Sequence, residues 1–154
     1  MPDKIKSQLQ FLYGDAQAQV VYSRLEKIIA HYQTSLRTHG TDAGEFFNEQ
    51  DAVLITYGDM VQEAGQRPLQ TLNEFMVGTA KESINTVHIL PFFPYSSDDG
   101  FSVIDYRQVD PDLGNWPDIT AFNKSFRLMF DAVVNHVSAQ SKWFEGFLDG
   151  EDQY

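Results

Sequence analysis

The chain has 154 residues, a net charge of −11 at pH 7 and no cysteine. The acidic balance argues against nucleic acid and anionic membranes as partners, because both bind basic patches. The absence of cysteine excludes disulfides, thiolate nucleophiles and cysteine-bound metals.

Residues 1–8 lack the apolar segment of a signal peptide. No run of about 18 apolar residues is present that could cross a membrane. We therefore expect a cytoplasmic protein with no membrane partner, whose oligomeric state is left open.

The first fifty residues have the pattern of helices. Residues 4–13 carry apolar side chains at helical spacing, and Gly14 and Asp15 interrupt the pattern. Residues 17–37 then repeat apolar side chains at i, i+4, i+7 and i+8, which predicts a long helix with one apolar face. A polar loop is expected over residues 38–48. Residues 1–50 are thus predicted to form a helical N-terminal extension.

From residue 51 onward, strand and helix patterns alternate. Short apolar runs of the kind that form strands buried on both faces occur at residues 51–57, 86–90 and 126–134. Helices are expected at residues 68–80, 117–124 and 141–148, where Pro or Ser stands at the start. This β-α-β-α-β-α order predicts an α/β fold with a parallel sheet and right-handed crossovers.

Two architectures fit that order, an open doubly wound sheet and a (β/α)₈ TIM barrel. No Gly-x-Gly-x-x-Gly or Walker lysine motif follows a strand, which removes the main nucleotide-binding signal of the open sheet. A barrel needs about 250 residues, and the third strand would leave an unpaired apolar edge. We therefore expect residues 51–154 to be the first three βα units of a barrel in a longer enzyme.

In such barrels the functional residues lie at the carboxyl ends of the strands. Asn135 and His136 are predicted to end the third strand, where an amide and a neutral imidazole can donate hydrogen bonds to sugar hydroxyls. A histidine at such a position can equally be satisfied by the backbone. Asp131 lies in an apolar run, so it needs a fixed hydrogen-bond partner and has a structural role.

The long loop over residues 91–116 is expected to be functional because of its length. One of the adjacent carboxylates of Asp98 and Asp99 can bind two sugar hydroxyls, and Phe101 can pack against a pyranose ring, although the composition alone favours a simple turn. Asp105 and Tyr106 are expected to tie this loop down by hydrogen bonds. Asp118 reads as a solvated residue at a helix end.

A metal site is not expected. The four histidines of the chain show no metal-binding spacing, and no glutamate flanks a histidine pair. Asn135 could supply a single oxygen ligand, whereas Ca²⁺ takes six or more.

Residues 87–94, 96–106 and 131–136 together resemble the sucrose phosphorylase branch of the α-amylase family (glycoside hydrolase family 13). The last segment matches the first conserved region of that family, Asp-x-x-x-Asn-His. The helical extension and residues 138–144 are most similar to the N-terminally extended sugar phosphorylases of this branch, those of glucosylglycerate foremost.

The resemblance implies roles for single residues. Asp98 and His136 match positions that hold the glucosyl ring in the donor subsite, and Phe101 matches the aromatic position that packs on it. Asp131 and Asn135 match positions that shape the site from beneath.

The resemblance also implies a retaining double displacement that transfers a glucosyl group to inorganic phosphate, without a metal ion or other cofactor. The catalytic carboxylates of the family follow the fourth, fifth and seventh strands, and so are expected beyond Tyr154. Two alternatives stay open. One is a hydrolase or transglucosidase of the wider family, and the other is an inactive fragment that only binds sugar or a partner. The acceptor cannot be read from these residues.

Overall fold

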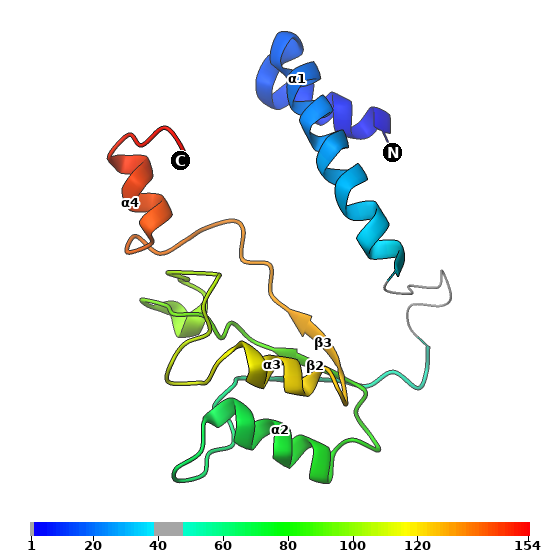
Figure 1. The fold of residues 1–154 in the computed structure, drawn as a ribbon, viewed down its shortest axis with the longest axis vertical. Coiled ribbons are helices and arrows are strands. Elements are labelled where there is room, and N and C mark those ends of the chain that lie inside the picture. The colour runs from blue at the N-terminus through cyan, green and yellow to red at the C-terminus, as the bar shows by residue number, and fades with distance from the viewer. Residues whose placement is uncertain (1, 39–47) are drawn as a thin grey trace. The chain divides into compact units, whose positions relative to one another are not determined.

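The computed structural model describes residues 2–38 and 48–154. They fall in two compact units, Met1–Phe46 and Phe47–Tyr154. The first unit contains α1 (Pro2–Thr38), the blue helix of Figure 1, in which Gly14 has non-helical backbone angles (φ 72°, ψ 164°). Gly14 thus separates two helical stretches, as its place in the sequence predicted. The loop predicted over residues 38–48 lies almost wholly outside the described residues.

The apolar side chains of α1 are mostly exposed. Phe11, Val20, Ile28 and Tyr32 are all more than half exposed, whereas Ala18 is buried. Of the predicted apolar stripe, Ile28, Ile29 and Tyr32 are about half exposed, so these residues form no buried core in the described part of this helix.

The second unit is built on a three-stranded sheet of β1 (Val53–Thr56), β2 (Thr86–Ile89) and β3 (Arg127–Phe130). The strand order is β1-β2-β3, and both neighbouring pairs run parallel. Parallel neighbours need crossover connections, which α2 (Pro68–Thr79) and α3 (Trp116–Phe122) provide. The parallel sheet predicted from the alternation of elements is confirmed.

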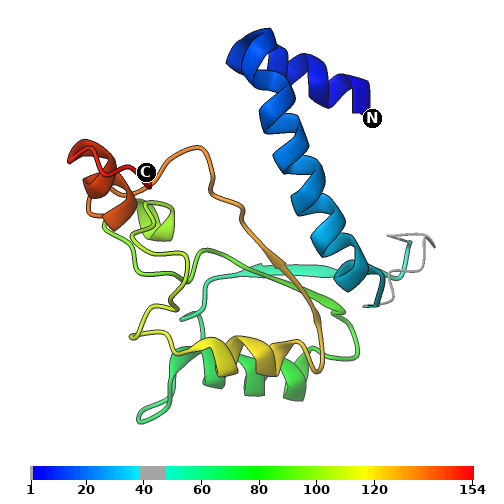
Figure 2. The same cartoon turned by 45° about the horizontal axis from the view of Figure 1, so that its top comes forward.

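Helices α2 and α3 lie together on one face of the sheet, as both views show (Figures 1 and 2). The hydrophobic core lies between these helices and the strands. Its buried members come from α2, β2 and α3 and from the adjoining loops, and include Leu69, Leu72, Met76, Val87, Ile89, Ile119 and Phe122. Burial of such side chains contributes roughly 1.5–3 kcal/mol each.

The opposite face of the sheet is open, which corrects the prediction of strands buried on both faces. Ile55 is 60% exposed and Met129 is 37% exposed, and both pair with His88 across the sheet. Within residues 48–154, both crossover helices pack on the opposite face of the sheet, so neither covers the row formed by Ile55, His88 and Met129. The continuous apolar run of a parallel strand indicates two buried faces only when a second layer is present.

The third strand is shorter than predicted, because β3 ends at Phe130 rather than at Val134. Asp131 follows the strand directly, whereas Asn135 and His136 lie in an irregular segment beyond it. The chain turns away from the sheet here, and Val134 is 90% exposed. The prediction that Asn135 and His136 end the strand is therefore wrong by several residues.

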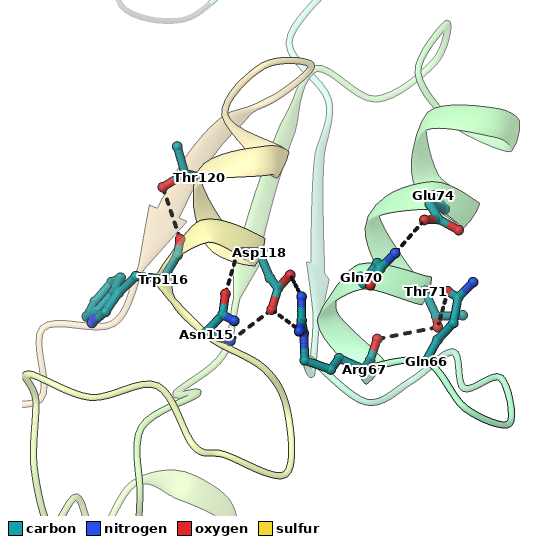
Figure 3. A network of polar contacts seen from close by, with 9 residues as sticks. All are labelled: Gln66, Arg67, Gln70, Thr71, Glu74, Asn115, Trp116, Asp118 and Thr120. Carbon is teal, nitrogen blue, oxygen red and sulfur yellow. Dashed lines mark hydrogen bonds and ion pairs between the residues drawn. The ribbon is translucent and has the colours of Figure 1, made fainter.

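An ion pair between Asp118 of α3 and the half-exposed Arg67, the residue before α2, joins the two helices of the covered face. Asp118 accepts hydrogen bonds from Nε and Nη2 of Arg67, both at 2.8 Å, and Figure 3 shows its carboxylate between Arg67 and Asn115. Asp118 and Asn115 also form a capping box at the start of α3. Asp118 is buried, so the prediction of a solvated helix-end residue is wrong. The Asn-x-x-Asp spacing was the sequence signal for this cap.

Helix starts were otherwise predicted correctly from Pro and Ser. Pro68 is the first residue of α2, and Ser141 caps α4 (Lys142–Leu148), its Oγ accepting from the amide of Trp143 at 3.2 Å. These signals are local, because proline fixes its own φ and a cap satisfies amides within one turn.

Candidate functional site

The carboxyl ends of the three parallel strands meet at one edge of the sheet. Tyr57, Leu90 and Asp131 are the first residues after β1, β2 and β3. Two cavities of about 450 Å³ and 490 Å³ include residues that follow these strands. In parallel α/β folds this edge is where ligands bind.

The first cavity is acidic. Four carboxylates line it, those of Asp59, Asp99, Asp110 and Asp112. Such a lining disfavours anions and suits neutral groups that donate hydrogen bonds, such as hydroxyls. Of the predicted loop residues, the structure places Asp99 here rather than Asp98.

The second cavity holds most of the predicted site residues. It is lined by residues 131–137 together with the aromatic side chains of Phe93, Tyr106 and Trp143. Asp131, Asn135 and His136 therefore share one cavity. Its walls combine apolar rings with a few polar groups, the usual makeup of a small-molecule site.

Asp98 and Phe101 lie at the tip of a short hairpin over residues 94–104. The hairpin is closed by a bridge between Tyr95 and Val103 and by a bond from the Ile104 amide to the Pro94 carbonyl at 2.7 Å. The turn indicated by the composition is confirmed, as a 3₁₀ turn over Asp98–Gly100.

The backbone of this tip is strained. Asp98 and Asp99 have φ of 60° and 48°, in the left-handed region that side chains disfavour, at a cost of roughly 1–3 kcal/mol each. Gly100 follows with φ 99°, and a Cβ there would lie 2.8 Å from the Pro91 carbonyl oxygen. Such strain persists only where the surroundings hold it, and it is concentrated at functional sites.

His136 joins its own segment to the hairpin tip. Its Nε2 lies 3.0 Å from the carbonyl oxygen of Phe101, and its Nδ1 lies 2.9 Å from the side-chain nitrogen Nδ2 of Asn135. A carbonyl only accepts, so Nε2 carries the proton and Nδ1 accepts from Asn135. Both ring nitrogens are therefore engaged, and a sugar hydroxyl that accepts from Nε2 must replace the Phe101 carbonyl.

The structure thus brings Phe101 and His136 together and leaves Asp98 exposed three residues away from Phe101 on the same turn. Phe101 is half-buried. Neither Asp98 nor Phe101 lines either of the two cavities.

Asp131 has the fixed partner that its apolar surroundings required. Its Oδ2 accepts from Nε2 of His88 at 2.9 Å. His88 lies on the open face of β2, so the bond joins the middle of one strand to the end of the next. A partly buried carboxylate is stabilised by such a donor, which supports a structural role for Asp131.

Tyr106 holds the segment that carries His136. Its hydroxyl donates to the Val133 carbonyl at 2.6 Å and lies 3.3 Å from that of His136. Its ring stacks on Trp143 with centroids 5.6 Å apart. Burial raises the pKa of Tyr106 above its usual 10.0.

Asp105 stabilises the adjoining turn. It accepts from the amide of Arg107 and from the side chain of Gln108, both at 2.8 Å. Tyr106 therefore ties the long loop to residues 133–136, as expected, whereas the hydrogen bonds of Asp105 stay within the loop.

Sequence reasoning missed two serines that connect the same parts. The hydroxyls of Ser96 and Ser138 lie 2.7 Å apart, and Ser138 is fully buried. No apolar period or motif identifies a serine as buried, so no sequence signal for this pair was available.

Among residues 2–38 and 48–154, no group of three or more His, Asp or Glu side chains is arranged to hold a metal ion. None of the helices in this part of the chain is long and apolar enough to span a bilayer.

Comparison with known proteins agrees with this geometry. Residues 80–154 match the model of the alpha amylase catalytic domain. The structure of a sucrose 6F-phosphate phosphorylase from Thermoanaerobacter thermosaccharolyticum superposes with a TM-score of 0.59 at 36% identity, over 70% of this chain and 21% of that one. The second unit is thus similar in fold to part of that phosphorylase and, over residues 80–154, to the alpha amylase catalytic domain.

The chain is also similar to several sugar phosphorylases. It is 47% identical to the glucosylglycerate phosphorylase of Allomeiothermus silvanus, over 97% of this chain and 26% of that enzyme. It is 39% identical to the sucrose phosphorylase of Streptococcus mutans, over 63% of this chain and 19% of that enzyme. The resemblance seen in the sequence is confirmed. The chain spans about a quarter of the length of the relatives it matches best.

Proposed function

We propose that this chain is the N-terminal portion of a retaining glucosyl-transferring sugar phosphorylase. In this proposal residues 1–50 are the helical extension, and residues 51–154 are the first three βα units of the catalytic barrel. The parallel order β1-β2-β3 and the open face of the sheet support it, because that face would line the interior of a closed barrel.

The proposed reaction transfers the glucosyl group of an α-glucoside to inorganic phosphate. The bond between the anomeric carbon and the acceptor oxygen breaks, an enzyme carboxylate takes the glucosyl group, and the acceptor oxygen receives a proton. A phosphate oxygen then displaces the carboxylate and forms α-glucose 1-phosphate. This double displacement needs two carboxyl groups about 5 Å apart, which we assign to positions beyond Tyr154.

In this reaction the described residues bind the donor sugar. Asp98 and His136 are proposed to hold hydroxyls of the glucosyl ring, with Phe101 packed against it. The observation that carries this assignment is the contact between His136 and the Phe101 carbonyl, which places the candidates from two separate loops side by side. Asn135 supports the ring of His136, and Asp131 anchors the start of the same segment through its bond to His88.

Glucosylglycerate is the substrate that the comparisons favour. Three glucosylglycerate phosphorylases align over 96–99% of this chain. Three sucrose phosphorylases align over only 62–63% of it. The helical residues 1–50 therefore have counterparts in the glucosylglycerate enzymes, so we propose glycerate as the acceptor.

The test uses the full-length protein with glucosylglycerate, with and without phosphate. We expect α-glucose 1-phosphate to form only with phosphate, and sucrose to be a poorer substrate by at least tenfold in kcat/KM. Free glucose released at the same rate without phosphate would instead identify a hydrolase or transglucosidase of the wider family. Failure to turn over any glucoside would favour the sugar-binding alternative.

A further inference from the structure

We propose that the hydroxyl pair of Ser96 and Ser138 is a positioning device that sets the spacing between the two halves of the donor-sugar subsite. The proposal rests on the proposed function, because it takes Asp98, Phe101 and His136 as the groups that hold the sugar. Neither serine is expected to touch the substrate.

The position of the pair along the chain is the first observation. Ser96 lies two residues before Asp98, and Ser138 lies two residues after His136. Their hydroxyl oxygens are 2.7 Å apart, so one short bond joins the loop that follows β2 to the segment that follows β3.

The second observation is the completeness of the hydrogen bonding around Ser138. This side chain is fully buried, and its hydroxyl also accepts from the amide of Gln140 at 3.0 Å. Its own amide donates to the Val103 carbonyl at 2.9 Å. Because the Ser138 oxygen already accepts from the Gln140 amide, its hydroxyl hydrogen is free to donate to the Ser96 oxygen. A buried hydroxyl without an acceptor would be costly in free energy.

Ser96 continues the connection into the hairpin. Its hydroxyl lies 3.2 Å from that of Ser102, and its amide donates to the Ser102 carbonyl at 3.0 Å. Ser102 directly follows Phe101. The two strands at the base of the hairpin tip are thus joined through Ser96 and Ser102, and Ser96 connects both to Ser138.

The strain of the tip explains why such a restraint matters. Asp98 and Asp99 are both in the left-handed region, a conformation that relaxes when its surroundings loosen. Without the bond between Ser96 and Ser138, we expect the tip to sample other conformations. Asp98 and the Phe101 carbonyl would then no longer be held at a constant distance from His136.

The experiment is a double-mutant cycle in the full-length protein with Ser96→Ala, Ser138→Ala and both together. Two quantities are measured, the Kd for glucose by calorimetry and kcat/KM for phosphorolysis of glucosylglycerate. We expect each single variant to raise the Kd and lower kcat/KM about fivefold to tenfold, the worth of one hydrogen bond. The loss in the double variant should be clearly smaller than the product of the two single losses, because both substitutions remove the shared bond between Ser96 and Ser138.

Two further variants separate positioning from folding. Ser96→Thr keeps the hydroxyl and should stay within twofold of the wild type. Ser97→Ala is the matched control, because Ser97 is exposed and its side chain makes no capping bond, so it should change neither quantity. Because Ser96 is exposed, Ser96→Ala should fold even if the buried Ser138→Ala variant does not, and Tm reports which variants are folded.

The outcomes separate the two proposals. If the wild type binds glucose but makes no glucose 1-phosphate, the proposed function fails, and the glucose Kd values still test the serine pair. Single effects that multiply in the double variant would overturn the positioning role, as would an unchanged Kd in Ser96→Ala. A wild-type protein that binds no glucose would overturn it as well.

Discussion

The covered face of the sheet and its carboxyl edge are built on different principles. The covered face has a dense apolar core and a bidentate ion pair between Arg67 and Asp118. The carboxyl edge has a strained hairpin tip, exposed polar side chains at Asp98 and His136, and single hydrogen bonds between loops. This contrast indicates that the helix layer supplies most of the stability, whereas the carboxyl edge is less stable and carries the groups that we propose to bind the sugar.

The largest expected effect on stability comes from Asp118→Ala. This change removes the N3 carboxylate of the α3 capping box and the partner of the Arg67 guanidinium, so we expect the free energy of unfolding to fall by about 3 kcal/mol. Denaturant unfolding of the full-length protein measures this loss. Asp149→Ala, at an exposed helix end, should change stability by less than about 0.5 kcal/mol. A loss of kcat/KM in Asp118→Ala that exceeds the loss of stability, with both expressed in kcal/mol, would contradict the assignment of stability to the helix layer and of binding to the carboxyl edge.

His136→Ala should have the opposite profile. We expect kcat/KM of the full-length enzyme to fall about a hundredfold, or about 2.7 kcal/mol, because a donor to the glucosyl ring is lost. Stability should change little, since His136 is exposed. Steady-state kinetics and thermal unfolding on the same preparations test both. An unchanged kcat/KM would remove His136 from the site.

Gly100→Ala tests the hairpin tip. The added Cβ would lie 2.8 Å from the Pro91 carbonyl oxygen at a φ of 99°, so we expect a loss of about 2 kcal/mol in stability. Gly65→Ala is the matched control, because Gly65 has φ 86° with nothing within 4 Å, and it should lose about 1 kcal/mol. Equal losses in the two variants would show that contact with Pro91 does not restrain the tip.

Tyr106→Phe should have the smallest effect, about 1 kcal/mol. Stacking on Trp143 is kept, and the hydroxyl loses its short bond to the Val133 carbonyl and its longer contact with the His136 carbonyl. Burial raises the pKa of Tyr106, so the stability linked to its neutral form is complete below pH 10 and is lost as pH rises through the raised value. The stability difference between wild type and variant should therefore narrow above pH 10. A constant difference across that range would argue against burial of the hydroxyl.

Much of the fold could be predicted because its signals are local. Gly14 divides α1, Pro68 begins α2 and Ser141 caps α4, and each effect acts within one turn of chain. The parallel sheet followed from the order of strands and helices. The length of β3 could not be predicted, because the apolar run continues past Phe130 and nothing local marks the point where the chain leaves the sheet.

The sequence alone determined the helix starts, the parallel α/β order and the family resemblance of the loop and strand-end motifs. Those features depend on backbone preferences and on patterns of neighbouring residues. Only the tertiary structure decided that Asp118 is buried against Arg67, that His136 reaches the Phe101 carbonyl and that Ser96 meets Ser138. Each of these contacts joins residues more than thirty positions apart, and hydrogen bonds over such separations follow from packing rather than from any local pattern.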